Sequence, residues 1–150
     1  MIGRLIGIDH GKARIGVALS DAMGIGAREL TILICKGEAA DFAAIADIAK
    51  REAAVGLVVG VPHNPNAPAG LPTQAEIVRD WIVRLRRVVP LPVVEVSEYL
   101  TSVEAGALAK QAKRGPREHI DDLAARVILQ SYLDALSYGS AKFPPRASKF

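Results

Sequence analysis

Two acidic residues stand at the carboxyl ends of apolar runs that are typical of β-strands, where a charge is unusual. Asp9 ends the run at residues 4–9, and Glu98 ends the run at residues 93–98. If the two strands are parallel neighbours, their carboxylates meet at the edge of the sheet where α/β proteins usually place their sites. Two carboxylates at so short a distance repel each other, and a hard divalent cation that prefers oxygen ligands neutralises this repulsion. The pair therefore predicts a metal site.

A third ligand is available at the start of the last predicted helix. The stretch RGPREHI gives way there to apolar residues at helical spacing, and both Asp121 and Asp122 fall in the first turn. Each acid also has a structural alternative. Asp9 could accept hydrogen bonds from turn amides, Glu98 could cap the following helix, and Asp121 is a suitable N-cap residue. Three acids at the ends of three elements favour the metal site over three separate caps.

The elements that must position these acids form a mixed α/β pattern. Runs at residues 4–9 and 14–20 flank a turn in which Gly11 can take a positive φ, and together they predict a hairpin. The expected order is three strands, helix, strand, helix, strand, helix and helix, which implies a mixed sheet flanked by helices. The later elements are a strand at 30–35, a helix from Asp41, a strand at 55–61, a helix opened by the capping box 73–76, a strand at 93–98, a helix from Thr101 and a helix at 121–136.

The composition fits one globular domain. The chain has 150 residues, 50% of them hydrophobic, and a net charge of +3 that permits a nucleic-acid partner without requiring one. The single cysteine, Cys35, excludes an internal disulfide and suits a reducing cytosol. The longest apolar stretch is about half the length that spans a bilayer, so we expect a cytoplasmic protein. Residues 1–138 are expected to form the domain and residues 139–150 a disordered tail.

Four segments of the sequence resemble the YqgF family. They are GIDHGKARIGVALSD from Gly7, LVVGVPHNPNAPAG from Leu57, SEYLTSVEA from Ser97 and HIDDLAARVILQSYLD from His119. The match runs from end to end and is most specific in the first and last segments. Members of this family are ribonuclease-H-like proteins, described as candidate Holliday junction resolvases and as nucleases that process the 5′ end of pre-16S ribosomal RNA.

The resemblance implies a ribonuclease-H-like α/β fold, with a five-stranded mixed sheet of three antiparallel N-terminal strands and two parallel strands. It also implies that Asp9, Glu98 and Asp121 bind two metal ions that catalyse hydrolysis of a phosphodiester. In the family register the third ligand is Asp121 rather than Asp122. One Mg²⁺ or Mn²⁺ between Asp9 and Asp121 would activate a water, and a second between Asp9 and Glu98 would stabilise the departing 3′ oxygen. The implied role is an endonuclease in the maturation of pre-16S rRNA and so in ribosome biogenesis.

The segment around Glu98 departs from the family pattern D-E-R-L-T-[ST]-x-E-A. Ser97 and Tyr99 replace the acid and the arginine beside the glutamate. If that arginine binds phosphate in relatives, the contact here is lost or comes from another side chain. The departure favours one alternative, a nucleic-acid-binding module with little turnover. A phosphate-binding ATPase of the actin type also begins with D-x-G, but it needs two lobes, and this chain supplies one.

Nucleic acid is the expected partner, as precursor rRNA or as a DNA junction. Junction cutting favours a homodimer, whereas trimming one RNA end needs only a monomer. His10 and His119 could assist proton transfer, although a histidine beside a turn is more often a solvated surface residue. Basic residues that could line a phosphate track are Arg14 in the first motif and Lys110, Lys113, Arg114 and Arg117 before Asp121, whereas Arg84, Arg86 and Arg87 fit a solvated helix face.

Overall fold

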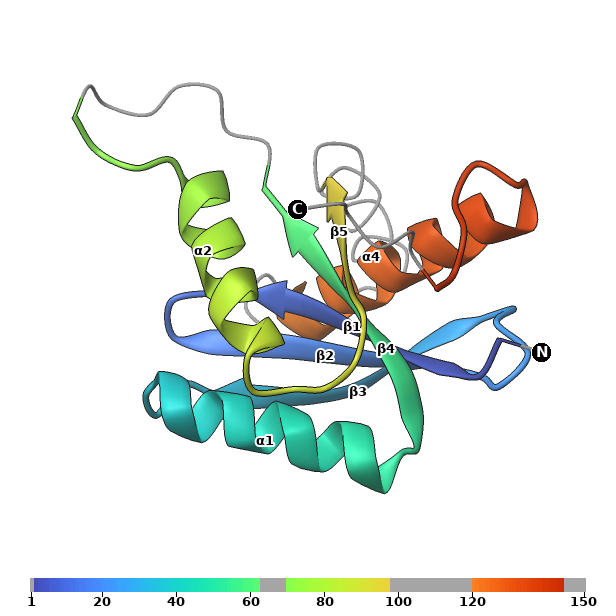
Figure 1. Ribbon diagram of the computed structural model, residues 1–150, viewed down its shortest axis with the longest axis horizontal. Coiled ribbons are helices and arrows are strands. Elements are labelled where there is room, and N and C mark those ends of the chain that lie inside the picture. The colour runs from blue at the N-terminus through green and yellow to red at the C-terminus, as the bar shows by residue number, and fades with distance from the viewer. Residues whose placement is uncertain (1, 63–69, 98–119, 145–150) are drawn as a thin grey trace.

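The computed structural model describes residues 2–62, 70–97 and 120–144, with the side chains of residues 120–122 outside that description. Strands and helices follow one another in the predicted order (Figure 1). The predicted helix from Thr101 lies outside the described residues. The described elements are β1 (Arg4–His10), β2 (Arg14–Ser20), β3 (Ala27–Ile34), α1 (Glu38–Arg51), β4 (Ala54–Val61), α2 (Gln74–Arg86), β5 (Val93–Ser97) and α4 (Ile120–Ser137).

The five strands form one mixed sheet in the order β3-β2-β1-β4-β5. β1, β2 and β3 are antiparallel neighbours, and β4 pairs in parallel with both β1 and β5. The predicted five-stranded mixed sheet is therefore confirmed. The expectation that the strands of Asp9 and Glu98 are neighbours is wrong, because β4 lies between β1 and β5. Neighbouring strands are about 4.8 Å apart, so these two are about 10 Å apart.

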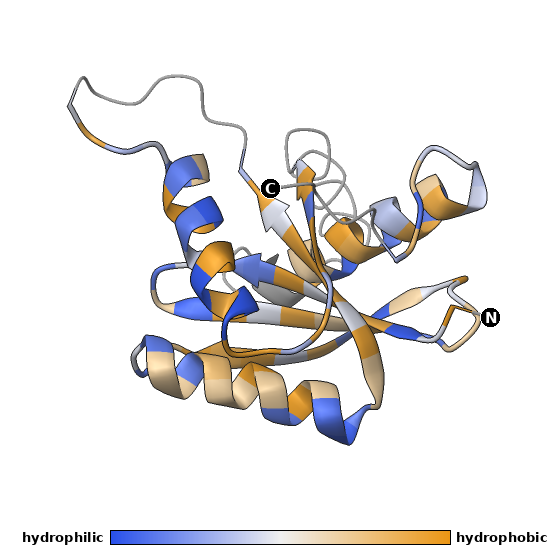
Figure 2. Cartoon of the chain, viewed as in Figure 1, coloured by the Kyte–Doolittle hydropathy of each residue, from blue (hydrophilic) through white to orange (hydrophobic). Residues whose placement is uncertain are grey.

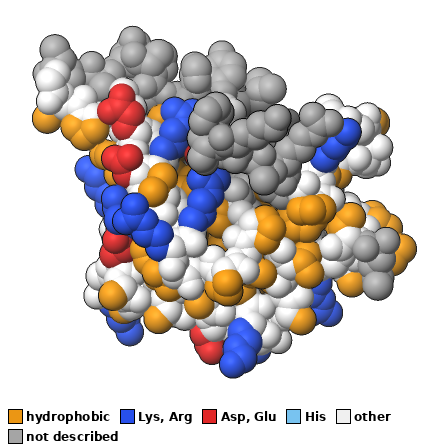
Figure 3. All heavy atoms as spheres, in the orientation of Figure 1, with side chains coloured by type: hydrophobic (Ala, Val, Ile, Leu, Met, Phe, Trp, Pro, Cys, Tyr) orange, Lys and Arg blue, Asp and Glu red, His pale blue; other side chains and the backbone are white. Residues whose placement is uncertain are grey.

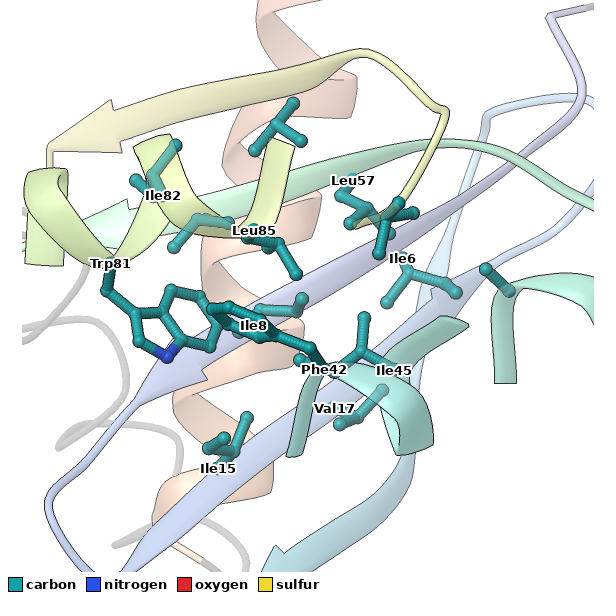
Figure 4. Packing of buried hydrophobic residues seen from close by; sticks show 14 of the residues in the cluster. Ile6, Ile8, Ile15, Val17, Phe42, Ile45, Leu57, Trp81, Ile82 and Leu85 are labelled. Atoms are coloured by element: carbon teal, nitrogen blue, oxygen red, sulfur yellow. The ribbon is translucent and has the colours of Figure 1, made fainter. Parts of the chain in front are cut away.

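Helices cover both faces of the sheet, and each face has its own apolar core. α1 and α2 pack on one face, which we call the α1/α2 face, and α4 packs on the other, the α4 face (Figure 1). Alternation along β1 sends Ile6 and Ile8 to the α1/α2 face, where they belong to one apolar cluster with Phe42 and Trp81 (Figure 4), and sends Leu5 to the α4 face. Figure 2 shows hydrophobic and hydrophilic residues alternating in α1 and α2, as amphipathic helices require.

α4 packs closely against the sheet at Gly7 of β1. A Cβ atom at Gly7 would lie 2.7 Å from the carbonyl oxygen of Ala125, so only glycine fits beneath the helix. Further along α4, Leu133 lines one cavity together with Ile2, which precedes β1. α4 therefore runs antiparallel to β1. Its first turn lies toward the end of β1 that carries Asp9.

The tip of the β2–β3 hairpin is fixed by two residues of the segments that resemble the family. The carboxylate of Asp21 accepts hydrogen bonds from the backbone N–H groups of Ile25, at 3.2 Å, and Gly26, at 2.7 Å. The side chain of Gln130 in α4 accepts one from Ala27 N–H at 2.9 Å and donates one to Ile25 O at 3.0 Å. These two motif residues therefore hold the hairpin against α4.

Two local predictions need correction. Gly11 does not have a positive φ; instead, a Cβ atom there would lie 2.6 Å from the carbonyl oxygen of Arg14, so the turn needs glycine for close approach. α1 begins at Glu38 rather than at Asp41, because Asp41 does not cap the helix but lies in its first turn. The capping box that begins at Thr73 is confirmed.

The segment of the chain that follows α4 folds back onto the sheet. Phe143 lies against Gly56 of β4, where a Cβ atom would come within 2.7 Å of its ring. The hydroxyl of Tyr132 donates a hydrogen bond to the carbonyl oxygen of Lys142 at 2.9 Å. The packed part of the chain therefore extends past residue 138 to Phe143. Within the described ranges, no helix is long and apolar enough to cross a membrane.

Candidate active site

Asp9 is the one proposed metal ligand whose side chain the structure describes. It is the penultimate residue of β1 and is half-buried. It lies on the α4 face, since Leu5 and Gly7, which alternate with it, both pack against α4. The first turn of α4, which contains Asp121, lies toward the same end of that face. The fold therefore brings the backbone of two of the three predicted ligands to one end of the α4 face.

Glycines flank Asp9 on both neighbouring strands. Gly16 of β2 is its partner in the antiparallel ladder. On the other side, Val59 of β4 is the partner of Ile8, so Gly60 comes level with Asp9. Directly paired residues share a face of the sheet. The two positions level with Asp9 on β2 and β4 therefore carry no side chain of their own.

The structure describes the positions of the other two predicted ligands only in part. β5 is described up to Ser97, with Val94 and Val96 on the α4 face. Glu98 lies outside the described residues, as does the side chain of Asp121. The described side chains contain no group of three or more His, Cys, Asp or Glu residues that could hold a metal ion. The cluster of three acids therefore stays a prediction.

Arg14 lies on the same face of the sheet as Asp9. It stands two residues before Gly16, the partner of Asp9, and side chains two apart in a strand share a face. Its side chain is exposed at the start of β2, and it takes part in none of the ion pairs found among the described residues. Arg14 is thus directed to solvent rather than into the core. Lys110, Lys113, Arg114 and Arg117 lie outside the described residues.

Arginines of α2 make hydrogen bonds to neighbouring elements of the protein. Figure 3 shows Lys and Arg side chains gathered over α2. The guanidinium of Arg84 donates to both carboxylate oxygens of Glu38, at 2.9 and 3.0 Å. Arg86 donates to the carbonyl oxygen of Val93 at 2.9 Å. These residues join α2 to α1 and β5 on the face opposite Asp9, and Arg84, Arg86 and Arg87 are all exposed, as expected for a solvated helix face.

His10 lies on the α1/α2 face, away from Asp9. Its ring packs against Trp81 with the centroids 4.7 Å apart. Its Nδ1 atom is buried and has no hydrogen-bond partner among the described residues. Burial is the main cause that lowers the pKa of His10 below 6.5, and the carboxylates of Asp41 and Glu38 oppose it. Because it lies across the sheet from Asp9, His10 is not placed to move a proton at the proposed metal site.

The lowered pKa of His10 predicts a pH-dependent stability. The folded state disfavours the protonated ring, so below pH 6.5 the unfolded chain binds the proton more readily and stability falls as the pH falls. His10→Phe keeps an aromatic ring against Trp81 and removes this titration. We expect wild type to lose more stability than the variant between about pH 7.5 and 5.5, measured by urea unfolding. Equal losses in the two proteins would show that His10 has no such effect.

Comparison with solved structures defines the class of the fold. The Thermus thermophilus RuvC structure in complex with a Holliday junction superposes with a TM-score of 0.65, covering 93% of this chain and 98% of that one at 16% identity. The fowlpox virus resolvase in complex with its junction DNA gives a TM-score of 0.52 at 12% identity, covering 89% and 98%. This chain therefore has the ribonuclease-H-like fold of these resolvases.

Sequence comparison then gives the family. The chain belongs to the RuvX (YqgF) family, described as Holliday junction resolvase, which matches residues 3–135. A Moorella thermoacetica protein is 43% identical over 136 residues, covering 89% of this chain and 96% of that protein. A Syntrophus aciditrophicus protein is 37% identical over 137 residues, covering 89% and 90%. Both carry the name “Putative pre-16S rRNA nuclease”. The resemblance found in the sequence is confirmed.

Proposed function

We propose that this protein is a divalent-metal-dependent endonuclease that acts in the 5′-end maturation of pre-16S rRNA. The main support is its membership of a nuclease family, with relatives up to 43% identical that carry the pre-16S rRNA nuclease name. The placement of Asp9 at the end of β1, toward the first turn of α4, agrees with that chemistry. Such a substrate would make it a cytoplasmic enzyme.

Asp9, Glu98 and Asp121 are the proposed ligands for Mg²⁺ or Mn²⁺. Carboxylate oxygens are the donors that such hard cations prefer. When bound, the ions supply an activated water and neutralise charge that develops on the departing oxygen. Asp9 is held by the β1–β2 ladder, so its carboxylate starts from a fixed backbone position. The positive end of the α4 dipole lies toward the same end of the face and favours a phosphate there.

Arg14 is the described residue that we assign to substrate binding. It is exposed on the face of Asp9, and a guanidinium binds phosphate oxygens in a bidentate way. If the family arginine binds phosphate, Arg14 is the described cation that we assign to replace that contact, because this chain has Tyr99 at the arginine position. Lys113, Arg114 and Arg117 remain candidates for the same track, since they precede Asp121 in the chain.

Resolution of Holliday junctions is the second candidate function. The observation that favours it is the fold shared with RuvC bound to a junction. The chemistry at the phosphodiester would be the same. The two functions differ in assembly, because symmetric cutting of a junction requires two sites in a homodimer, whereas a monomer can trim an RNA end.

Cleavage of two defined substrates tests the proposal. Purified protein with Mn²⁺ or Mg²⁺ is expected to cut a precursor 16S RNA fragment with a 5′ extension and to leave a 5′ phosphate on the product, with no cleavage in EDTA. Cutting only a four-way DNA junction would favour the second function. Cutting neither substrate with either metal would contradict both. Depletion in the native cell, followed by mapping of 16S ends, is expected to show accumulation of the precursor.

A further inference from the structure

We propose that Lys12, Arg14 and Lys36 form a basic rim that guides the substrate strand past Asp9 and over the β1–β2 turn. The inference rests on the proposed nuclease function and adds the path of the substrate. Lys12 lies in the β1–β2 turn, Arg14 begins β2 and Lys36 follows β3. All three side chains are exposed. They come from segments that are separate in sequence and meet at the end of the sheet that holds Asp9.

Backbone pairing brings together the two segments that carry the lysines. Arg14 and Ile34 are partners in the β2–β3 ladder. The ladder continues past both strands, because the N–H group of Cys35 donates to the carbonyl oxygen of Ala13 at 2.9 Å. Lys12 and Lys36 are each the next residue beyond this hydrogen-bonded pair, and Lys12 lines one cavity with Cys35 and Gly37, the chain neighbours of Lys36. The rim is therefore compact.

The rim carries an excess of positive charge. Neither Lys12, Arg14 nor Lys36 takes part in an ion pair found among the described residues. Two acids of α1, Glu38 and Asp41, line one cavity with Lys12, and Glu38 is held by Arg84. Asp41 is 8% exposed and accepts a hydrogen bond from the backbone N–H group of Lys36 at 3.0 Å.

Like charges gathered at one end of the sheet repel one another, so this arrangement costs stability in the isolated protein. A polyanion compensates that cost. Arg14 lies about 7 Å along β2 from the residue opposite Asp9, a distance that an arginine side chain can bridge. A nucleic-acid strand offers a series of phosphates, so one phosphate at Asp9 and the next ones along the rim can be bound together. Binding of this kind is independent of base sequence.

The test uses full-length protein in the Asp9→Asn background, so that binding is measured without cleavage. The probe is a fluorescein-labelled single-stranded RNA that carries the 5′ end of precursor 16S. Lys12→Gln/Lys36→Gln is compared with the matched control Lys50→Gln/Lys142→Gln, which also removes two exposed lysines. Lys50 lies in the last turn of α1, about 18 Å from the start of that helix at a rise of about 1.5 Å per residue, so it is remote from the rim.

Two results are expected. The rim variant should bind about tenfold more weakly at about 0.1 M salt, and the slope of log K against log salt should fall by about 1.4, which corresponds to two lost phosphate contacts on a single strand. The control should bind like its parent. Removing the two lysines should leave the melting temperature unchanged or raise it, because repulsion within the rim is relieved.

The same two pairs of Lys→Gln substitutions are then made in the protein that keeps Asp9. There the rim variant should raise KM and leave kcat almost unchanged. A rim variant that binds with the affinity and salt slope of the control, while wild type cuts RNA, would overturn the inference and leave the nuclease function standing. If wild type neither binds nor cuts the RNA, both proposals fail.

Discussion

Asp9→Asn is expected to lose about 4 kcal/mol of transition-state stabilisation, which is about a thousandfold in the rate of metal-dependent cleavage. The amide keeps the size of the carboxylate but removes the negative charge that binds the cation. Each of the two proposed metal ions depends on Asp9, so no other single ligand replaces it. The measurement is single-turnover cleavage of the precursor RNA fragment with saturating Mn²⁺.

Asp47→Asn is the matched control for this substitution. In the part of the chain that the structure describes, the side chain of Asp47 makes only an exposed ion pair with Arg51 in α1, at 3.5 Å. Such pairs contribute little, so cleavage by the control should equal that of wild type. RNA binding and the melting temperature of Asp9→Asn should stay close to the wild-type values. Cleavage at the wild-type rate by Asp9→Asn, in a preparation free of other nucleases, would contradict the proposed role of Asp9.

Gly7→Ala is expected to reduce both stability and cleavage. The added Cβ atom would lie 2.7 Å from Ala125 O and 2.7 Å from the Cβ atom of Leu129, both in α4. Neither atom is the end of a flexible side chain, so the helix itself must move. Overpacking of this kind costs about 1–3 kcal/mol of unfolding free energy. A shift of about 1 Å in the first turn of α4 would reduce the rate about a hundredfold, because Asp121 is misplaced.

Gly26→Ala is the control for adding the same methyl group. The nearest atom to a Cβ there is a carboxylate oxygen of Asp21 at 3.7 Å, which is ordinary contact. We expect this variant to cleave like wild type. Urea unfolding and cleavage are measured at the same temperature, with Gly7→Ala still folded. Wild-type stability and rate in Gly7→Ala would show that the close approach of α4 to β1 does not position the site.

Much of the fold was predictable because local patterns set it. The apolar runs and the helical spacing give the right order of elements, and alternation along β1 places Asp9 opposite Ile6 and Ile8. The same alternation, followed one residue further, would have put His10 on the face away from Asp9. Extended through β2, it would have put Arg14 on the Asp9 face. These signals were present in the sequence.

Strand order was not predictable in the same way. Both β4 and β5 follow crossover helices, and nothing in their apolar runs says which of them pairs with β1. The rim was missed for a related reason. Lys12 and Lys36 are twenty-four positions apart in the sequence and are brought together only by the register of the β2–β3 ladder. The close approach at Gly7 likewise depends on where α4 crosses the sheet.

The central claim is that Asp9 holds catalytic divalent ions together with Glu98 and Asp121. The most direct measurement is anomalous diffraction from crystals of the full chain soaked in Mn²⁺. We predict a manganese peak about 2.1 Å from a carboxylate oxygen of Asp9, with oxygens of Glu98 and Asp121 completing the protein ligands. Manganese bound elsewhere in the molecule, with none at Asp9 and the three carboxylates too far apart to share an ion, would contradict the account.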